Sequence, residues 1–237
     1  MNHDTITTFS NEWWIFNSCT IILIVFLILF SKKLASNSKN RFKNFLAFIF
    51  ICELVLMNSY YVLEGNWILT ESLPLHLCSI MWIISIIFLL TRSQRLFELL
   101  LFIGMPGAFH SLITPELTNG NNLINKIEFF FNHGGLIFVP LFAIFTLNMW
   151  PRKASWLKSF VALQIMALFV FLVNNLIGSN YMFLMNPPIA NNPLIPDSNT
   201  FFGEWPFYII ILEFAVLFHI ILIYLPFKIK GKLIGKI

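Results

Sequence analysis

Seven long apolar runs constrain the fold of this chain more than any other feature. They lie at about 13–31, 42–63, 73–91, 96–114, 127–149, 155–177 and 206–226. An apolar stretch of about 20 residues is long enough to cross the hydrocarbon core of a bilayer as a helix. Because these runs account for most of the 237 residues, we predict an all-α bundle of seven transmembrane helices, built as a single domain over residues 1–237.

The composition agrees with a membrane-embedded chain. Hydrophobic residues make up 58% of the sequence and charged residues only 11%, whereas about a quarter of the residues in a soluble domain are charged. The formal net charge of +4 does not indicate a nucleic-acid partner, because the basic residues flank the apolar runs, where they meet anionic lipid headgroups. Cys19, Cys52 and Cys78 all fall within apolar runs, which argues against a disulfide framework. We expect a multi-pass protein of the cell membrane whose main partner is membrane lipid.

The basic residues also predict an orientation. All but one of the 15 lysines and arginines fall in the connections after the first, third and fifth runs or in the C-terminal tail. Lys126 is the exception, and it shares its side of the membrane with acids such as Glu71 and Glu116. Since basic connections stay in the cytoplasm, we predict that the N-terminus lies outside the cell and the C-terminus in the cytoplasm.

The longest connection, at 178–205, has a composition of its own. It contains several prolines and asparagines, yet its first part, from Tyr181 to Met185, is apolar. It is too polar and too rich in proline to span a membrane. We interpret it as a loop that folds back over the outer mouth of the bundle as a lid; the alternative is a loose external loop.

Three histidines lie inside apolar runs, all near the outer side: His76, His110 and His133. An ionisable group in hydrocarbon costs at least about 2.5 kcal/mol, so such residues usually face the interior of a bundle and mark a site. With a helical rise of about 1.5 Å per residue, the three lie roughly 5–9 Å below the outer surface. The alternatives are that the two nearer the helix ends extend to the interface and that His133 is structural. Glu53, near the middle of the second run, and His219 in the last are less informative.

Amide and carboxyl groups from other helices are expected at the same depth. Asn174 and Asn175 end the sixth run, and Glu213 lies in the last run with no basic residue at its level. We therefore assign these three to the same pocket, together with Asn180 and Tyr181 of the long loop. The asparagines could instead hold helices together, a common role of amides in membranes.

Cys78 is a candidate nucleophile in the third run. Residues two positions apart on a helix do not face each other, so His76 is not expected to act as its base. A base would come from another helix, His133 and His110 being the candidates. The alternative is an inert thiol, as is usual for a cysteine buried among apolar neighbours.

Several motifs resemble the YwaF-type bacterial integral membrane proteins, a family without an established activity. The similarity covers most of the chain and rests on Leu73-Pro74-Leu75-His76-Leu77-Cys78, Gly107-Ala108, Leu112-Ile113-Thr114-Pro115-Glu116, Phe131-Asn132-His133-Gly134, Asn180-Tyr181-Met182-Phe183-Leu184, Gly203 and Trp205-Pro206-Phe207-Tyr208. Relatives commonly carry glutamine at the position of His110 and serine at that of Asn132. A more distant similarity leads to the eukaryotic membrane acyltransferases and the androgen-induced-gene-type lipid hydrolases. By that resemblance, Cys78 would be the nucleophile and His133 its base.

Three hypotheses for the function follow. The first is a lipid acyl hydrolase or acyltransferase in the outer leaflet, with Asn174 or Asn175 stabilising the oxyanion. The second is a small-solute or proton-coupled transporter in which Glu213 carries the proton. The third is a non-catalytic binding or assembly subunit.

No cofactor or metal is predicted. The last run contains no lysine for a retinal Schiff base, and the chain has neither an HExxH zinc motif nor a CxxCH haem motif. Ligation of a haem by His76 and His133 is an alternative that no motif supports.

Overall fold

The computed structural model describes residues 4–189 and 200–231, and nearly all of its regular structure is helical. The helices are α1 (Asn11–Lys33), α2 (Ser36–Leu63), α3 (Leu77–Thr91), α4 (Gln94–Leu99), the π-helix η1 (Leu100–Gly104), α5 (Met105–Ile113), α6 (Leu123–Phe145), α7 (Ser155–Ile177), the 3₁₀ turn η2 (Tyr181–Phe183) and α8 (Phe207–Ile229). Two short antiparallel strands, β1 (Asp4–Thr5) and β2 (Glu116–Leu117), complete the fold. The predicted all-α membrane bundle agrees with this architecture.

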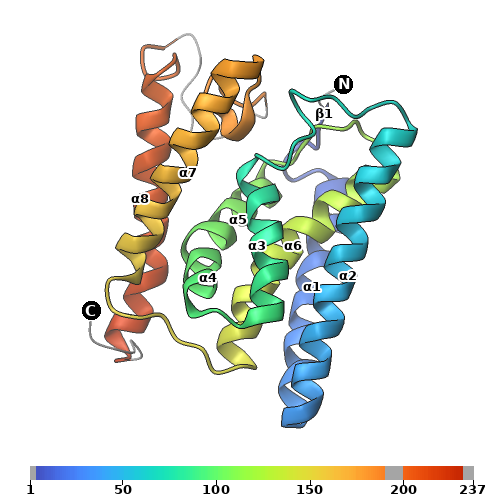
Figure 1. Cartoon of the computed structure of the whole chain (residues 1–237), viewed down its shortest axis with the longest axis vertical. Coiled ribbons are helices and arrows are strands. Elements are labelled where there is room, and N and C mark those ends of the chain that lie inside the picture. The colour runs from blue at the N-terminus through green and yellow to red at the C-terminus, as the bar shows by residue number, and fades with distance from the viewer. Residues whose placement is uncertain (1–3, 190–199, 232–237) are drawn as a thin grey trace.

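Six helices in the described part of the chain are long and apolar enough to span a membrane, counting α4, η1 and α5 as one. The third predicted run differs, because α3 begins at Leu77 rather than at residue 73 and has only 15 residues. Pro74 lies in an irregular turn before it, in which the N–H of Leu75 donates to the carbonyl of Leu73. As a result α3 starts well inside the bundle, below the end of α2 that precedes it (Figure 1).

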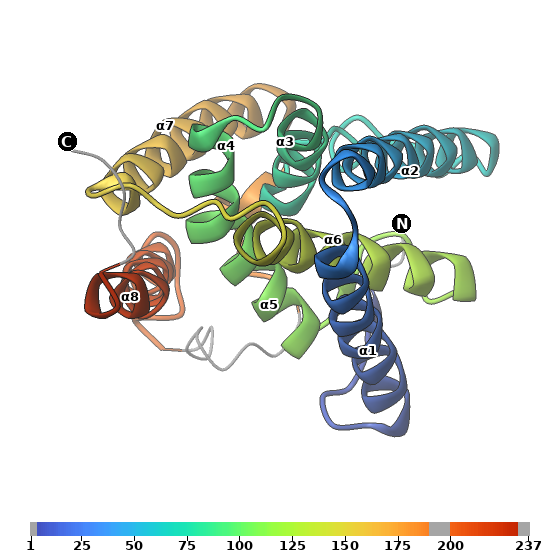
Figure 2. The same ribbon diagram turned by 90° about the horizontal axis from the view of Figure 1, so that it is seen from below.

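Helix α6 is the central element of the bundle. It packs against α1, α3 and α5 (Figure 2), and a glycine pair allows two of these approaches. A Cβ added at Gly134 would lie 2.6 Å from Thr20 of α1, and one at Gly135 would lie 2.5 Å from the ring of Trp82 on α3. Trp82 also stacks on Phe50 of α2, with ring centroids 3.9 Å apart. Helices α2, α3 and α6 therefore pack together around the contact between Phe50 and Trp82.

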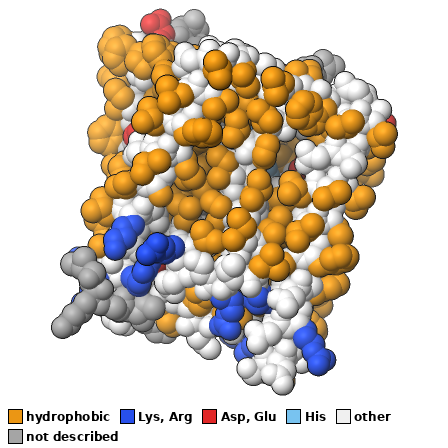
Figure 3. All heavy atoms as spheres, in the orientation of Figure 1, with side chains coloured by type: hydrophobic (Ala, Val, Ile, Leu, Met, Phe, Trp, Pro, Cys, Tyr) orange, Lys and Arg blue, Asp and Glu red, His pale blue; other side chains and the backbone are white. Residues whose placement is uncertain are grey.

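The outer faces of the bundle are apolar. Helices α7 and α8 lie to one side of the other helices (Figure 2), and many of their large side chains are exposed, including Leu168, Phe169 and Phe218. Figure 3 shows hydrophobic side chains over most of one face of the molecule, with Lys and Arg gathered at one end. We call this the basic end. The pattern agrees with a multi-pass membrane protein whose helices contact lipid.

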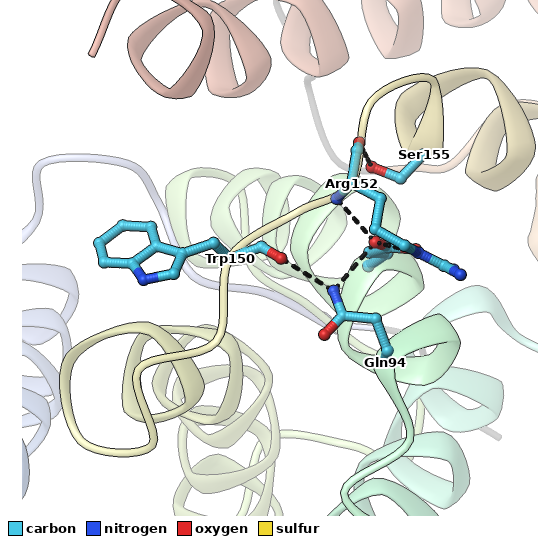
Figure 4. Close-up of polar contacts among 5 residues, drawn as sticks. Gln94, Trp150, Arg152 and Ser155 are labelled. Atoms are coloured by element: carbon cyan, nitrogen blue, oxygen red, sulfur yellow. Dashed lines mark hydrogen bonds and ion pairs between the residues drawn. The ribbon is translucent and has the colours of Figure 1, made fainter. Parts of the chain in front are cut away.

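One ion pair and several hydrogen bonds hold the basic end together. The Arg152 guanidinium binds Glu98 in a bidentate manner, with Nη2 2.7 Å from Oε2 and Nε 3.0 Å from Oε1 (Figure 4). Gln94 donates to Glu98 and to the carbonyl of Trp150, which ties the α6–α7 connection to α4. Hydrogen bonding to Glu98 raises the pKa of Arg152 above its usual value. The buried ammonium of Lys43 donates to the last carbonyls of α3.

At the opposite end, the N-terminal segment covers the C-terminus of α5. The last carbonyls of a helix lack partners within it. Here the carbonyl of Ile113 accepts from the Thr8 hydroxyl and the Trp13 indole, and Asn17 donates to the carbonyl of Leu112. Pairing of β1 with β2 extends this contact along the loop that follows α5. The N-terminal segment therefore holds residues 114–119 in place.

Candidate functional site

A cavity of about 380 Å³ lies between the helices toward the opposite end from the basic residues. Side chains of α2, α3, α5, α6, α8 and the loops around them form its wall. The polar and ionisable residues that line it are Glu53, Asn58, Tyr61, Glu71, Ser72, His76, Cys78, Ser79, Trp82, His110, Ser111, Thr114, Glu116, Thr118, Asn119, Glu128, Asn132 and His133. Four of the predicted site residues, Cys78, His133, His76 and His110, thus share one chamber.

Cys78 lies in the first turn of α3, with its thiol against α5. Its Sγ is 3.9 Å from Ser111 Oγ, and Ser111 in turn donates to the carbonyl of Gly107. The serine oxygen is therefore left as the acceptor of the thiol proton. The backbone N–H groups of Cys78 and Ser79 precede the first helical hydrogen bond, which the N–H of Ile80 makes. Two orphan N–H groups thus accompany the thiol at a helix N-terminus.

His133 lies one helical turn beyond Phe129 on the cavity face of α6. Its Nδ1 is 2.7 Å from the carbonyl of Phe129, an oxygen that can only accept. Nδ1 therefore carries a proton, and in the neutral ring Nε2 is the acceptor. The residue is 9% exposed, so this base is held in a dry environment.

His76 is held by the long loop. It is the N-cap of α3, and its Nδ1 accepts a hydrogen bond of 3.3 Å from the N–H of Met182. Its ring also packs against Tyr181 and Phe183, with centroids 5.1 and 5.5 Å away. Met182, Phe183 and Pro188 of this loop line the cavity, and a role of the loop as a lid stays a prediction. Residues 190–199 of the same prediction lie outside the described residues.

His110 has a partner that was not expected. Its Nε2 is 2.9 Å from Nε2 of His219 on α8, and Nδ1 of His219 is 2.6 Å from the carbonyl of Ala215. His219 therefore accepts through Nε2 and His110 donates. The sequence offers no sign of this pair, since the two residues are far apart along the chain.

Tyr181 and Asn174 form the frame of the loop and do not line the cavity. Asn174 accepts from the N–H of Tyr181 and donates to its carbonyl, both at 2.9 Å. The fully buried Tyr181 hydroxyl donates to the carbonyl of Leu69 and accepts from the N–H of Leu73. Burial raises the pKa of Tyr181, and the charge of Glu71 adds to the effect, so the hydroxyl remains a donor. Together they anchor the loop to the segment that leads into α3.

Three other predicted pocket residues lie elsewhere. Asn175 is exposed and donates to the carbonyl of Phe171 in its own helix. Glu213 faces α7, where Gln164 donates to it at 2.8 Å. Asn180 lines a neighbouring hollow and holds the turn to Asn186. Consecutive residues such as Asn174 and Asn175 point about 100° apart on a helix, so only one of them can face inward.

Several residues that line the cavity cannot be identified from their predicted depth in the membrane alone. Glu128 is, in the sequence, an ordinary flanking residue near the start of the fifth run, and Glu53 stands alone in the second. Helical spacing would have found them: Glu53 and Tyr61 are two turns apart on α2, and Glu128 and Asn132 are one turn apart on α6. Both pairs line the cavity.

In the described part of the chain, no cluster of three or more His, Cys, Asp or Glu side chains is placed to hold a metal ion. Two of the polar groups that line the cavity, His133 and Ser111, are bonded to carbonyls of their own helices. What the arrangement offers is a thiol, a neutral imidazole and free N–H groups in one chamber.

Comparison with known proteins identifies the family. Residues 8–224 match the TMEM164 family. The chain belongs to this family. An uncharacterised protein of Treponema pallidum (strain Nichols) is 25% identical over 193 residues, which are 80% of this chain and 76% of that protein. No solved structure matches the chain. The TMEM164 match confirms a resemblance to a membrane protein family over most of the chain, but neither comparison names the YwaF-type proteins or an acyltransferase.

Proposed function

We propose that this TMEM164-family protein is a lipid acyl hydrolase or acyltransferase that works through Cys78 and His133. The observation that carries the proposal is the shared cavity, whose wall includes both a thiol and a histidine with an available Nε2. A nucleophile with a base fixed by a third group is the usual arrangement for acyl transfer. Here the third group is the carbonyl of Phe129.

The chemistry divides into two steps. In the first, Cys78 Sγ attacks the carbonyl carbon of an acyl ester, its proton passes to His133 Nε2, and the C–O bond breaks as that proton is returned to the leaving alcohol. In the second, water or an acceptor hydroxyl attacks the thioester, His133 takes its proton, and the thiol is restored with the proton on sulfur. Hydrolysis and transfer differ only in the second nucleophile.

The start of α3 supplies a place for the oxyanion. A helix N-terminus favours negative charge, and the N–H groups of Cys78 and Ser79 make no hydrogen bond within the described residues. They replace Asn174 and Asn175 in this role, since those side chains lie outside the cavity. The irregular turn around Pro74 keeps these two N–H groups available. In a helix that began at residue 73, both would donate to carbonyls of the preceding turn.

The setting suits a lipid substrate. The cavity lies among membrane-spanning helices, and apolar side chains of several elements line it, among them Leu77, Met182 and Leu212. With the predicted orientation it faces the outer leaflet. Transport has less support, because Glu213, the expected proton carrier, is bonded to Gln164 outside the cavity.

The test is turnover of a phospholipid by the purified protein in nanodiscs, followed by mass spectrometry of the products. We expect Cys78→Ser and His133→Ala to lower the rate at least about 100-fold, as removal of a nucleophile or base does. Cys52→Ser is the matched control, because Cys52 is a helix cysteine that does not line the cavity. If neither variant changes any lipid pool that the wild-type protein changes, the proposal fails.

A further inference from the structure

The wall of the cavity carries four carboxyl side chains. The carboxylates that line it are Glu53, Glu71, Glu116 and Glu128. No Lys or Arg is among the described residues of the wall. The basic residue nearest to Glu128 along the chain, Lys126, is bonded to Glu12 on α1. Within the described residues, therefore, no lysine or arginine of the wall lies against Glu53 or Glu128.

Glu53 and Glu128 form a pair within this wall. They come from α2 and α6 and lie close enough for their charges to interact. Glu53 Oε2 is buried and makes no hydrogen bond within the described residues. Like charges held close together in a medium of low dielectric repel strongly, and either a bound proton or a bound cation relieves that repulsion.

Two buried polar groups lie beside these acids. Tyr61 is 8% and Trp82 1% exposed, both line the cavity, and neither the hydroxyl nor the indole N–H makes a close hydrogen bond within the described residues. The indole N–H of Trp82 is near enough to Glu53, and the Tyr61 hydroxyl near enough to Asn119, for a weaker interaction, so both groups have room for a closer partner in the cavity. Tyr61 also interacts electrostatically with Glu128, which places its oxygen at the same spot.

We propose that Glu53, Glu128, Tyr61 and Trp82, which we call the acidic end, bind an ammonium group. The positive charge of such a group offsets the two carboxylates, and the Tyr61 oxygen, which lies beside Glu128, faces the N–H or N-methyl hydrogens of the group. The ammonium can belong to a lipid headgroup or to a small organic cation.

The rest of the cavity fits the remainder of such a ligand. Apolar residues from three other elements also line the cavity, namely Gly107 of α5, Met182 and Phe183 of η2, and Leu212 of α8, and such a lining suits an acyl chain. Helix α3 packs against both α2 and α5, and its Cys78 thiol lies near Ser111 of α5 in the same cavity. In taking the bound molecule as an acyl lipid, the inference rests on the proposed function.

The test compares two single-chain lipids with the same acyl chain, one with a phosphocholine and one with a phosphoglycerol headgroup. Binding to the purified full chain is measured by calorimetry. We expect the wild-type protein to bind the choline lipid at least about tenfold more tightly, and we expect Glu53→Gln and Glu128→Gln to bring the ratio close to one. Glu64→Gln is the control, because Glu64 is an exposed residue at the end of α2 that does not line the cavity.

Two further measurements distinguish a lipid headgroup from a free cation and show whether a variant is still folded. Tetramethylammonium chloride, set against sodium chloride at equal ionic strength, displaces the choline lipid if a free cation suffices; choline preference without this displacement assigns the site to the headgroup. Tyr61→Phe, which removes one oxygen, should lower the preference without loss of helical circular dichroism. Equal binding of both lipids to the wild-type protein, or an unchanged ratio in folded Glu53→Gln and Glu128→Gln, overturns the proposal.

The outcome is distinguishable from that of the catalytic proposal. Cys78→Ser should keep the choline preference, because the thiol is not part of the acidic end. A preference without any lipid turnover would contradict only the acyl-transfer function. Turnover without a preference would contradict only the ammonium site.

Discussion

At the scale of single residues, the cavity histidines are set by their hydrogen-bond partners. The carbonyl of Phe129 fixes the proton of His133 on Nδ1, whereas the N–H of Met182 takes the lone pair of Nδ1 in His76. The two rings therefore present different atoms, and only His133 is prepared as a base. Neighbouring residues of identical type also differ in role, as Asn174 and Asn175 show.

Asn174→Ala should destabilise the loop over the cavity. Asn174 makes three hydrogen bonds, to Ser179 and to both backbone groups of Tyr181, and leaving buried partners unsatisfied costs about 1–3 kcal/mol. We expect a lower melting temperature and faster proteolysis near residue 181. Asn175→Ala, which removes only a bond within its own helix, should leave both unchanged; equal effects of the two variants would contradict this assignment.

At the scale of elements, the start of α3 and the glycine pair of α6 shape the site. Helix α3 begins four residues later than the predicted run, which brings Cys78 into the first turn. Gly135 lets Trp82 lie directly on α6, so that its indole reaches the acidic end. Two backbone features thus place a nucleophile and a cavity wall.

Gly135→Ala should disturb this contact. The new Cβ would lie 2.5 Å from Trp82 Cζ3 and 3.1 Å from Phe50 Cζ, and overpacking of this kind costs about 1–3 kcal/mol. We expect a lower melting temperature and a shift of tryptophan fluorescence. The comparison is Gly104→Ala, whose Cβ would meet no atom nearer than 3.4 Å; if it is as damaging as Gly135→Ala, packing on Trp82 is not the cause.

Arg152→Met should loosen the connection between α6 and α7. The variant leaves Glu98, 3% exposed, without its bidentate partner. Removing one member of a buried pair costs about 3–5 kcal/mol, and the cost is smaller here because the Arg152 side chain is 34% exposed. Thermal melting in detergent measures the loss. Lys153→Met, at the exposed neighbouring residue, should melt like the wild-type protein.

At the scale of the whole molecule, the lengths of the apolar runs predict the helical architecture well, whereas the orientation inferred from charge stays a prediction. The apolar runs locate the spanning helices to within a few residues, because length and hydropathy alone decide what can cross a bilayer. The exception is α3, whose start depends on the local turn at Pro74 and on contacts with a distant loop. The sequence also groups Cys78 with His133, His76 and His110, since depth along a helix is readable from residue number.

The sequence did not predict which side of each helix faces the cavity or which side chains of different helices contact each other. Glu213 and Asn175 have the predicted depth but face away from the cavity, and Glu128 faces inward although nothing at its depth marks it out. The contact between His110 and His219 depends on how α8 packs against the other helices. Such features arise from packing of the whole molecule and not from any local pattern.

The orientation predicted from the basic residues can be tested by labelling. In a background with the three native cysteines replaced by serine, Asn66→Cys at the end opposite the basic residues should react with a membrane-impermeant maleimide in intact cells. Lys153→Cys, at the basic end, should react only after permeabilisation. The reverse pattern would contradict the predicted orientation and would turn the cavity toward the cytoplasm.

The most direct test of acyl transfer at Cys78 is the mass of the intermediate. The purified protein is incubated with a phospholipid that carries a deuterated acyl chain, quenched in acid and digested. We predict that the peptide containing Cys78 gains the mass of that acyl group, that hydroxylamine removes it, and that His133→Ala greatly reduces it. Lipid turnover with no acyl group on Cys78, or with the label only on Cys19 or Cys52, would contradict the mechanism.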